Sequence, residues 1–335
     1  LHGAGRRGGL WRALVAGVLL AVLLAACAST PEEDLDRATV EELALLRTYA
    51  PYENGELIVE DGIVLHFRTW LPPGGGTGPP AMLIHGLGAS TFSFREISSW
   101  MADLGYVVIA VDVPPFGYSD RRDRAIETIR HELFWKLADR LETDPGLVGA
   151  RITGPWTLVG HSLGGRVAAG MARSRPEEVS DLVLLAGAVQ FEQNRASIPF
   201  VTTDPVSRLL EASLRELGSP DSLASVLANA YGQMPSDEAI QGYYEPFTVP
   251  GTVPAVVRFS SQALQEIGPL SEIQARTLLI WGNEDTWVPI SVGYRAAERI
   301  PDSLMIVVPG AAHIPLETHP HQVRRAMSLF FEEEG

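Results

Sequence analysis

A serine flanked by glycines follows a short apolar segment and is the first residue in the chain with a clear chemical use. The segment Trp156–Val159 leads directly into Gly160-His161-Ser162-Leu163-Gly164-Gly165, where a helical pattern begins. A nucleophilic serine must be exposed at the end of a rigid strand. A sharp strand-to-helix turn, with small residues two before and two after the serine, provides that exposure. We therefore predict that Ser162 is a nucleophile.

A serine nucleophile requires a base, and the base requires a carboxylate that orients it. Asp285 lies in the loop after an apolar run ending at Ile280, and His313 lies in the loop after a run ending at Val308. The carboxyl ends of consecutive parallel strands meet at one edge of a sheet, so these side chains are expected to converge there. We therefore expect His313 and a carboxylate of the loop 281–289, Asp285 or the neighbouring Glu284, to act together with Ser162.

The elements that must position these residues alternate between apolar and amphipathic segments. Short apolar runs predict strands buried on both faces, and they cover 81–84, 106–111, 156–159, 182–185, 277–280 and 304–308, after a hairpin over 57–70. Pro72–Pro80 is expected to be a loop. Helical patterns lie between most of the runs, over 94–104, 126–142, 164–173, 292–300 and 322–331. This alternation is typical of an α/β fold with a mainly parallel sheet covered by helices on both faces.

The alternation is interrupted once, over residues 189–272. This stretch has no buried-strand run and instead has helical patterns over 205–217, 221–231, 236–244 and 254–267. It is expected to be a helical cap inserted into a core formed by residues 51–188 and 273–335. The alternative is a peripheral helical excursion that does not contact the site.

The ordered motifs from about Leu57 to the C-terminus resemble the α/β-hydrolase fold family with a helical cap. The resemblance implies an eight-stranded sheet and a triad in which Ser162 is the nucleophile, His313 is the general base and acid, and Asp285 is the carboxylate that orients His313, with Glu284 as the alternative carboxylate. His85-Gly86-Leu87-Gly88 matches the family's oxyanion loop, which implies the backbone N–H groups of Leu87 and Leu163 as the donor pair. Asp112–Ser119 matches the family's following loop, except that Pro115 stands where glycine is usual.

The expected activity is hydrolysis of carboxylic esters with small to medium apolar groups, through an acyl-enzyme. Phe116 and Trp287 are predicted to line the substrate site, and no metal or organic cofactor is implied. Two alternatives remain open: hydrolysis of a carbon–carbon bond in a diketone by the same triad, and a binding lipoprotein that has no catalytic activity and uses the same fold.

The first residues have the pattern of a bacterial lipoprotein signal. Arg6, Arg7 and Arg12 precede an apolar run over 13–26, which is too short to span a bilayer, and the run ends at Cys27. We expect residues 1–26 to be removed, Cys27 to be acylated, and the exported protein to be anchored to the cell-envelope membrane. Residues 27–50 are expected to form a tether or a peripheral helix.

Composition excludes other classes of protein. The chain of 335 residues has 26 basic and 41 acidic residues, a net charge of −15, and no run of lysine or arginine. Nucleic-acid binding is therefore not expected, because phosphate contacts need clustered basic residues. The single cysteine excludes an internal disulfide. Nothing in the sequence predicts an oligomeric state.

Overall fold

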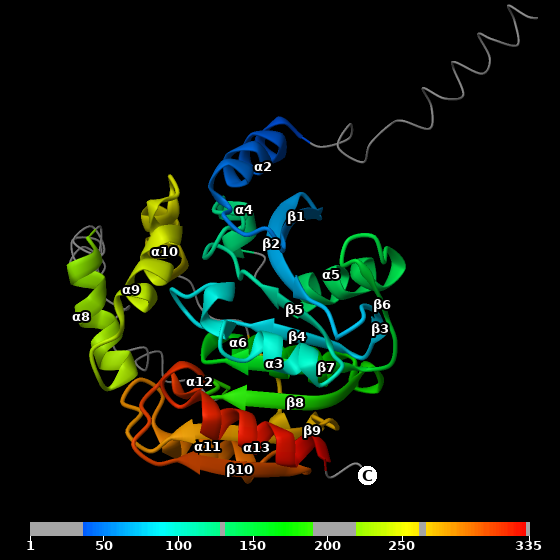
Figure 1. Ribbon diagram of the computed structural model, residues 1–335, viewed down its shortest axis with the longest axis vertical. Coiled ribbons are helices and arrows are strands. Elements are labelled where there is room, and N and C mark those ends of the chain that lie inside the picture. The colour runs from blue at the N-terminus through cyan, green and yellow to red at the C-terminus, as the bar shows by residue number, and fades with distance from the viewer. Residues whose placement is uncertain (1–35, 128–130, 190–218, 261–265, 333–335) are drawn as a thin grey trace, which may run out of the picture.

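An eight-stranded sheet forms the centre of the molecule (Figure 1). The computed structural model describes residues 36–127, 131–189, 219–260 and 266–332. The sheet has the order β1-β2-β5-β4-β7-β8-β9-β10, and all neighbours from β5 to β10 are parallel, whereas β1, β2 and β5 pair antiparallel. Its strands are β1 (Gly55–Glu60), β2 (Ile63–Trp70), β4 (Pro80–Ile84), β5 (Val107–Val111), β7 (Trp156–His161), β8 (Val179–Leu185), β9 (Arg276–Gly282) and β10 (Ser303–Val308). The predicted fold class is confirmed.

The register of the parallel strands aligns their carboxyl ends. Ile84 of β4 pairs with Gly160 of β7, Leu185 of β8 pairs with Ile280 of β9, and Gly282 of β9 pairs with Val308 of β10. The loops that follow these strands therefore leave the sheet from one edge, which is where open α/β sheets place their ligands.

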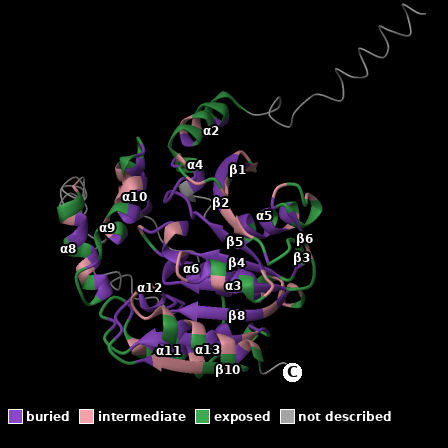
Figure 2. Ribbon diagram, in the orientation of Figure 1, coloured by how far each residue is buried: buried purple, intermediate pink, exposed green. Residues whose placement is uncertain are grey.

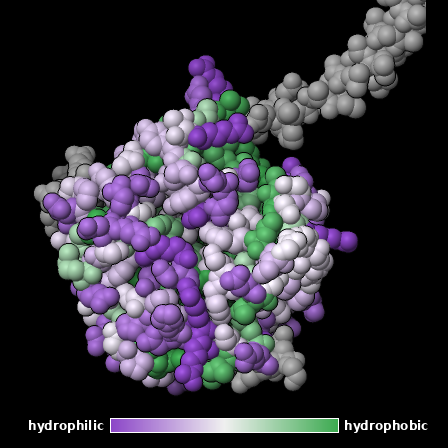
Figure 3. Space-filling view, viewed as in Figure 1, coloured by the Kyte–Doolittle hydropathy of each residue, from purple (hydrophilic) through white to green (hydrophobic). Residues whose placement is uncertain are grey.

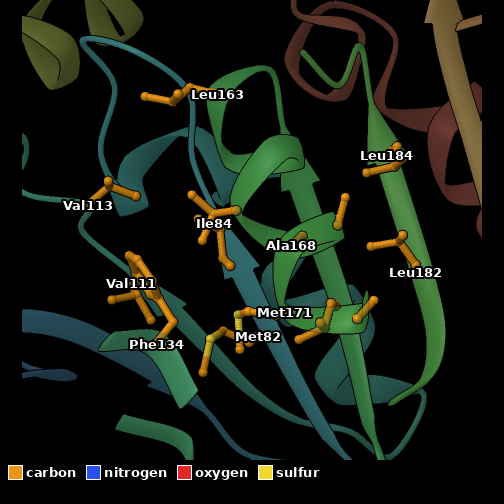
Figure 4. Close-up of a cluster of buried hydrophobic side chains, with 14 of the residues drawn as sticks. Met82, Ile84, Val111, Val113, Phe134, Leu163, Ala168, Met171, Leu182 and Leu184 are labelled. Atoms are coloured by element: carbon orange, nitrogen blue, oxygen red, sulfur yellow. The ribbon is translucent and has the colours of Figure 1, made fainter. Parts of the chain in front are cut away.

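Helices cover both faces of the sheet, and the central strands β5, β4, β7, β8 and β9 are almost completely buried, whereas the edge strands β1 and β10 are partly exposed (Figure 2). One face packs on α5 (His131–Thr143), α6 (Leu163–Ser174) and α11 (Ile290–Ala297), and the other on α3 (Ser98–Asp103) and α13 (Pro320–Glu332). Met82 and Ile84 belong to the first core, seen in Figure 4, while Ala81 and Leu83 belong to the second. Successive residues of β4 thus face opposite layers, which explains why such strands read as continuous apolar runs.

The described part of the insert is helical and lies beyond the carboxyl ends of the strands (Figure 1). Its main helices are α8 (Pro220–Tyr231), α9 (Asp237–Tyr244) and α10 (Thr252–Ser260), with short 3-10 helices at Glu245–Thr248 and Leu270–Glu272. Leu227 of α8 packs in the core beside α13, whereas Phe259 of α10 packs in the core beside α6. The insert therefore contacts the hydrophobic layers on both sides of the sheet.

Helix α8 has clear end signals in the sequence. The side chain of Ser219 accepts a hydrogen bond from the backbone N–H of Ser222, Pro220 occupies the first turn, and Gly232 ends the helix in the left-handed conformation. This combination of a serine cap, an early proline and a terminal glycine is typical of a well-defined helix. The expected helix over 205–217 lies outside the described residues.

Several predicted element bounds were wrong. The expected helix over 94–104 starts only at Ser98, because the preceding residues form a separate 3-10 helix, Thr91–Phe94, capped by the side chain of Ser90. The expected helix over 254–267 ends at Ser260 in the described part, and Ile267 is not helical. Around the expected helix over 126–142, the structure describes α4 (Asp123–Glu127), which begins three residues earlier than expected, and α5, while residues 128–130 lie outside the described residues. The predicted loop 72–80 contains the short strand β3 (Gly76–Gly78), which pairs with β6 (Ala150–Ile152).

The N-terminal described segment is the docked helix α2 (Arg37–Tyr49). Leu43 and Leu46 are buried against the hairpin of β1 and β2, and the side chain of Asp36 caps the helix by accepting from the N–H of Thr39. Residues 1–35, including the expected signal segment and Cys27, lie outside the described residues. Among the helices that the structure describes, none is long and apolar enough to cross a bilayer.

Candidate active site

Ser162 stands at the strand-to-helix turn between β7 and α6. Its backbone has φ of 50° and ψ of −117°, a region that residues other than glycine rarely adopt. Three backbone hydrogen bonds hold it there: its N–H donates to the carbonyl of Leu185 (3.0 Å), and its own carbonyl accepts from Gly165 (3.0 Å) and Ala188 (2.8 Å). The turn therefore projects the Ser162 side chain from a rigid support, as the sequence predicts.

The glycines around Ser162 are required by close backbone contacts. A Cβ atom on Gly164 would lie 1.9 Å from the carbonyl oxygen of Ile84, and one on Gly160 would lie 2.5 Å from the carbonyl oxygen of Gly164. Neither neighbouring atom is a side chain that could move aside. The turn can pack against β4 only because Gly164 lacks a side chain, and it can close tightly on itself only because Gly160 does.

Ser162, His313 and Asp285 form a continuous chain of hydrogen bonds. The Nε2 atom of His313 is 2.9 Å from Ser162 Oγ, and its Nδ1 atom is 2.8 Å from Asp285 Oδ2. All three side chains are buried or nearly so. A carboxylate that accepts the Nδ1 proton leaves the lone pair of Nε2 facing the hydroxyl, which is the arrangement that general-base catalysis requires.

Asp285, and not Glu284, is the carboxylate that the structure brings to His313. The second oxygen of Asp285, Oδ1, accepts from the backbone N–H groups of Trp287 (2.8 Å) and Val288 (2.9 Å), which fixes the orientation of the carboxylate. Glu284 is exposed to solvent, and its backbone N–H donates to the carbonyl of Ala311.

The two predicted oxyanion donors lie next to Ser162. Leu87 is in a turn closed by a hydrogen bond from Ala89 N–H to the Gly86 carbonyl (3.2 Å), and a Cβ atom on Gly86 would lie 3.0 Å from the Cβ of Ser162. Leu163 is the first residue of α6, where backbone N–H groups have no acceptor within the helix. Their role as donors to a bound substrate stays a prediction.

The buried His85 and Asp112 brace the loops beside the site. His85 Nδ1 donates to the carbonyl of Gly86 (2.8 Å) and its Nε2 accepts from the N–H of Val113 (2.9 Å), so the ring is neutral in this tautomer. Burial lowers the pKa of His85. Burial alone would raise the pKa of Asp112, but the neighbouring His66 at 2.7 Å lowers it. Asp112 also accepts from the N–H of Tyr118 (2.8 Å), which anchors the loop that contains Pro115.

His161 is a second buried histidine beside the triad. Its Nε2 donates to the carbonyl of His313 (2.9 Å), and its Nδ1 has no hydrogen-bond partner among the described residues. Burial, together with the nearby His313 ring, lowers the pKa of His161 to about 3. The ring is therefore neutral throughout the physiological range.

We expect His161 to make the protein less stable in acid. In the unfolded chain the pKa of His161 is about 6.5, so the ring binds a proton below that pH. In the folded protein the same ring stays neutral until about pH 3. The free energy of unfolding therefore falls as the pH falls, by about 2 kcal/mol between pH 6.5 and pH 5 for one such proton. Urea unfolding of His161→Gln should show a smaller loss over this interval than the wild type. The exposed His321→Gln should behave as the wild type does, and an unchanged loss in His161→Gln would contradict the expectation.

The two residues predicted to line the substrate site have different environments. Trp287 is 42% exposed and its ring stacks on His313, with centroids 5.4 Å apart and an interplanar angle of 24°. Phe116 is only 2% exposed and packs edge-on against His85 and against Phe259 of α10. Trp287 is thus at the reacting groups, whereas Phe116 joins the loop after β5 to the cap.

A buried polar cluster around Glu317 lies near the site and was not predicted from the sequence. Glu317, four residues after His313, has a completely buried side chain that accepts hydrogen bonds from Arg95, Tyr231 and Tyr243. Burial raises the pKa of Glu317, against the opposing effect of Arg95. The cluster joins α8 and α9 of the cap to the core. No sequence pattern marks it, because a glutamate beside Pro315 and Leu316 reads as an ordinary exposed helix residue.

The described residues offer no obvious metal centre. No three histidine, cysteine, aspartate or glutamate side chains in this part of the chain are grouped as metal ligands. The chemistry that the arrangement can perform is that of the serine, the imidazole and the carboxylate.

Comparison with known proteins agrees with the fold. A model of the α/β-hydrolase fold family matches residues 79–320. An uncharacterized hydrolase, YugF, of Bacillus subtilis is 28% identical over 81% of this chain and 96% of its own length. A 2-hydroxy-6-oxononadienedioate/2-hydroxy-6-oxononatrienedioate hydrolase of Burkholderia vietnamiensis is 28% identical over 82% of this chain and 93% of its own. A pimeloyl-[acyl-carrier protein] methyl ester esterase of Chromobacterium violaceum is 27% identical over 78% of this chain and 97% of its own.

Proposed function

Because this chain belongs to the α/β-hydrolase fold family and is a hydrolase, we propose that it cleaves carboxylic esters of small to medium apolar substrates through an acyl-enzyme. The observation that carries the proposal is the hydrogen-bonded chain from Asp285 through His313 to Ser162. A relative whose name describes a methyl ester esterase supports the same bond type.

The proposed reaction has two stages, formation of the acyl-enzyme on Ser162 and its hydrolysis, and His313 transfers a proton in both. His313 Nε2 takes the proton from Ser162 Oγ as the oxygen attacks the ester carbonyl. The N–H groups of Leu87 and Leu163 stabilise the resulting oxyanion, with each donor of this kind contributing about 3 to 4 kcal/mol. His313 then gives the proton to the departing alcohol. A water molecule, activated by the same histidine, releases the acid and restores Ser162.

Carbon–carbon bond hydrolysis is the second candidate. The Burkholderia vietnamiensis relative has a name that describes a hydrolase of an oxo-dienedioate, and the same serine, histidine and carboxylate could serve that reaction. A direct comparison of p-nitrophenyl butyrate with a vinylogous 1,5-diketone acid separates the two candidates. We expect turnover of the ester, and turnover of the diketone alone would favour the second candidate.

The cap helices are expected to limit the length of the acyl group. They lie over the edge of the sheet that carries Ser162, and a covered apolar cleft gains about 0.8 kcal/mol for each methylene that it buries. We expect kcat/KM for p-nitrophenyl esters to rise from acetyl to short or medium chains and then to fall. A flat profile, or a preference for long-chain emulsified lipid, would contradict confinement by the cap.

We also propose that the protein is exported and attached to the cell-envelope membrane through an acylated Cys27. The support is the basic leader, the apolar run over 13–26 and the cysteine that follows it. Hydrophilic and hydrophobic patches are mixed on the face of the folded body shown in Figure 3. The net charge of −15 opposes binding to anionic headgroups, so attachment would depend on the acyl chains.

Mass spectrometry of the protein from its native host is expected to show an acylated N-terminal cysteine at position 27. Cys27→Ser should remain unprocessed or be released from the membrane while its ester hydrolysis is unchanged, because α2 begins ten residues later, at Arg37. A mature N-terminus at another residue, without acylation, would contradict the proposal.

A further inference from the structure

The last turn of cap helix α8 contacts the catalytic loops and the residues beside them through three consecutive residues, Asn229, Ala230 and Tyr231. Each of the three makes one hydrogen bond to a different residue of the core. Helix α8 is an insertion far from the triad in sequence, so these contacts are formed only by the fold.

Asn229 holds the side chain of Trp287. Its Oδ1 accepts from the indole Nε1–H at 2.5 Å, and the indole ring stacks on His313. The backbone N–H of Trp287 also donates to Asp285 Oδ1. Trp287 therefore contacts both the base and the carboxylate. Its backbone is held by Asp285, and Asn229 holds its exposed indole side chain, which could otherwise rotate.

Ala230 holds the backbone of His313. Its carbonyl accepts from the His313 N–H at 2.9 Å. Gly232, which ends α8, also lies close to this loop, because a Cβ atom on Gly232 would lie 3.0 Å from the Cβ of Ala312. The end of α8 is thus packed directly on the loop that carries His313.

Tyr231 fixes the end of α8 to the core. Its hydroxyl donates to the buried Glu317, which also binds Arg95 of the core and Tyr243 of α9. A buried carboxylate with a charged partner and two hydroxyl donors is costly to separate, because each group would be left without a partner. The contacts of Asn229 and Ala230 are therefore made from a fixed support.

We propose that Asn229 is a positioning residue for ester hydrolysis. By holding Trp287, it keeps the indole stacked on His313 and keeps that ring aligned between Asp285 and Ser162. The inference rests on the proposed function and assigns a role in the reaction to a residue of the cap that touches neither the nucleophile nor the base.

The test is a double-mutant cycle on p-nitrophenyl butyrate with Asn229→Ala, Trp287→Phe and the double variant. Both side chains are exposed, so the variants should fold. Each single change should lower kcat about threefold to tenfold, the change that corresponds to one ordinary hydrogen bond. In Asn229→Ala, which leaves the residues predicted to line the substrate site unchanged, KM should stay within about twofold of the wild type. The double variant should be no slower than Trp287→Phe alone, because both changes break the same contact.

Two further variants separate positioning from a general effect on α8. Asn229→Asp keeps an oxygen acceptor for the indole and should retain the kcat of the wild type. Ser225→Ala, one turn earlier on α8 and exposed, removes only a hydrogen bond to the carbonyl of Asp221 and should change neither kcat nor KM. Independent, multiplicative losses in the double variant would overturn the proposal. So would an unchanged kcat in Asn229→Ala, or a rise in its KM alone.

NMR of the His313 ring distinguishes failure of this proposal from failure of the proposed function. Its resonances, assigned by comparison with His313→Gln, should move in Asn229→Ala and stay in place in Ser225→Ala. If the resonances move but the wild type hydrolyses no ester, positioning holds and the proposed activity is wrong. If the ester is hydrolysed and the resonances do not move, the activity stands and the positioning role is wrong.

Discussion

Ser162→Ala should abolish ester hydrolysis and labelling by a fluorophosphonate while the fold is retained. The change removes the hydroxyl oxygen that lies 2.9 Å from His313 Nε2 and leaves the strained turn supported by the same three backbone hydrogen bonds. Loss of a triad serine typically lowers kcat by about 10⁶-fold, leaving only the contribution of the oxyanion donors and substrate binding. The measurements are kcat on p-nitrophenyl esters and the extent of covalent labelling.

Ser98→Ala is the matched control for this variant. Ser98 is also buried, and its hydroxyl donates to the backbone carbonyl of Phe94, which is not part of the triad. It should lose some stability but remain fully labelled and active. Turnover near that of the wild type in purified Ser162→Ala would refute the role of Ser162, and it would leave a binding protein on a hydrolase fold as the better explanation.

The sequence predicts the strands well because their environment in the fold is uniform. Every residue of β4 is buried, and residues that face both layers must all be apolar, so the run 81–84 is visible without any knowledge of its neighbours. The loops after such strands are then placed at one edge by topology alone. This is why Ser162, Asp285 and His313 could be proposed together although more than 150 residues separate the first from the last.

Features that depend on contacts between distant segments could not be predicted. The 3-10 helix Thr91–Phe94 is supported from another loop, because the N–H of Thr91 donates to Asp112 at 2.6 Å. The role of Glu317 depends on tyrosines of two cap helices. Asn229 has no neighbour in the sequence that suggests a contact with Trp287. Local periodicity contains no information on such pairs.

The second large effect on kcat is expected from replacing the carboxylate of Asp285. Asp285→Asn should lower kcat about 10³- to 10⁴-fold, and the hydrogen bonds of Asp285 explain why. Its Oδ1 accepts from two backbone N–H groups, so the amide oxygen of asparagine must take that position. The amide NH₂ then faces His313 Nδ1 and donates to it. This selects the tautomer that carries its proton on Nε2, and that nitrogen can no longer accept the proton of Ser162.

Glu284→Gln is the matched control for Asp285→Asn, because it makes the same chemical change at the preceding residue. Glu284 is exposed, and the change keeps its backbone hydrogen bond to the carbonyl of Ala311, so the kcat of Glu284→Gln should stay within about twofold of the wild type. Asp112→Asn removes a buried acceptor of Thr91, Tyr118 and His66. It should therefore lower the free energy of unfolding far more than it lowers kcat. A severe loss of kcat in Glu284→Gln, with Asp285→Asn active, would mean that Glu284 replaces Asp285 as the partner of His313 in solution.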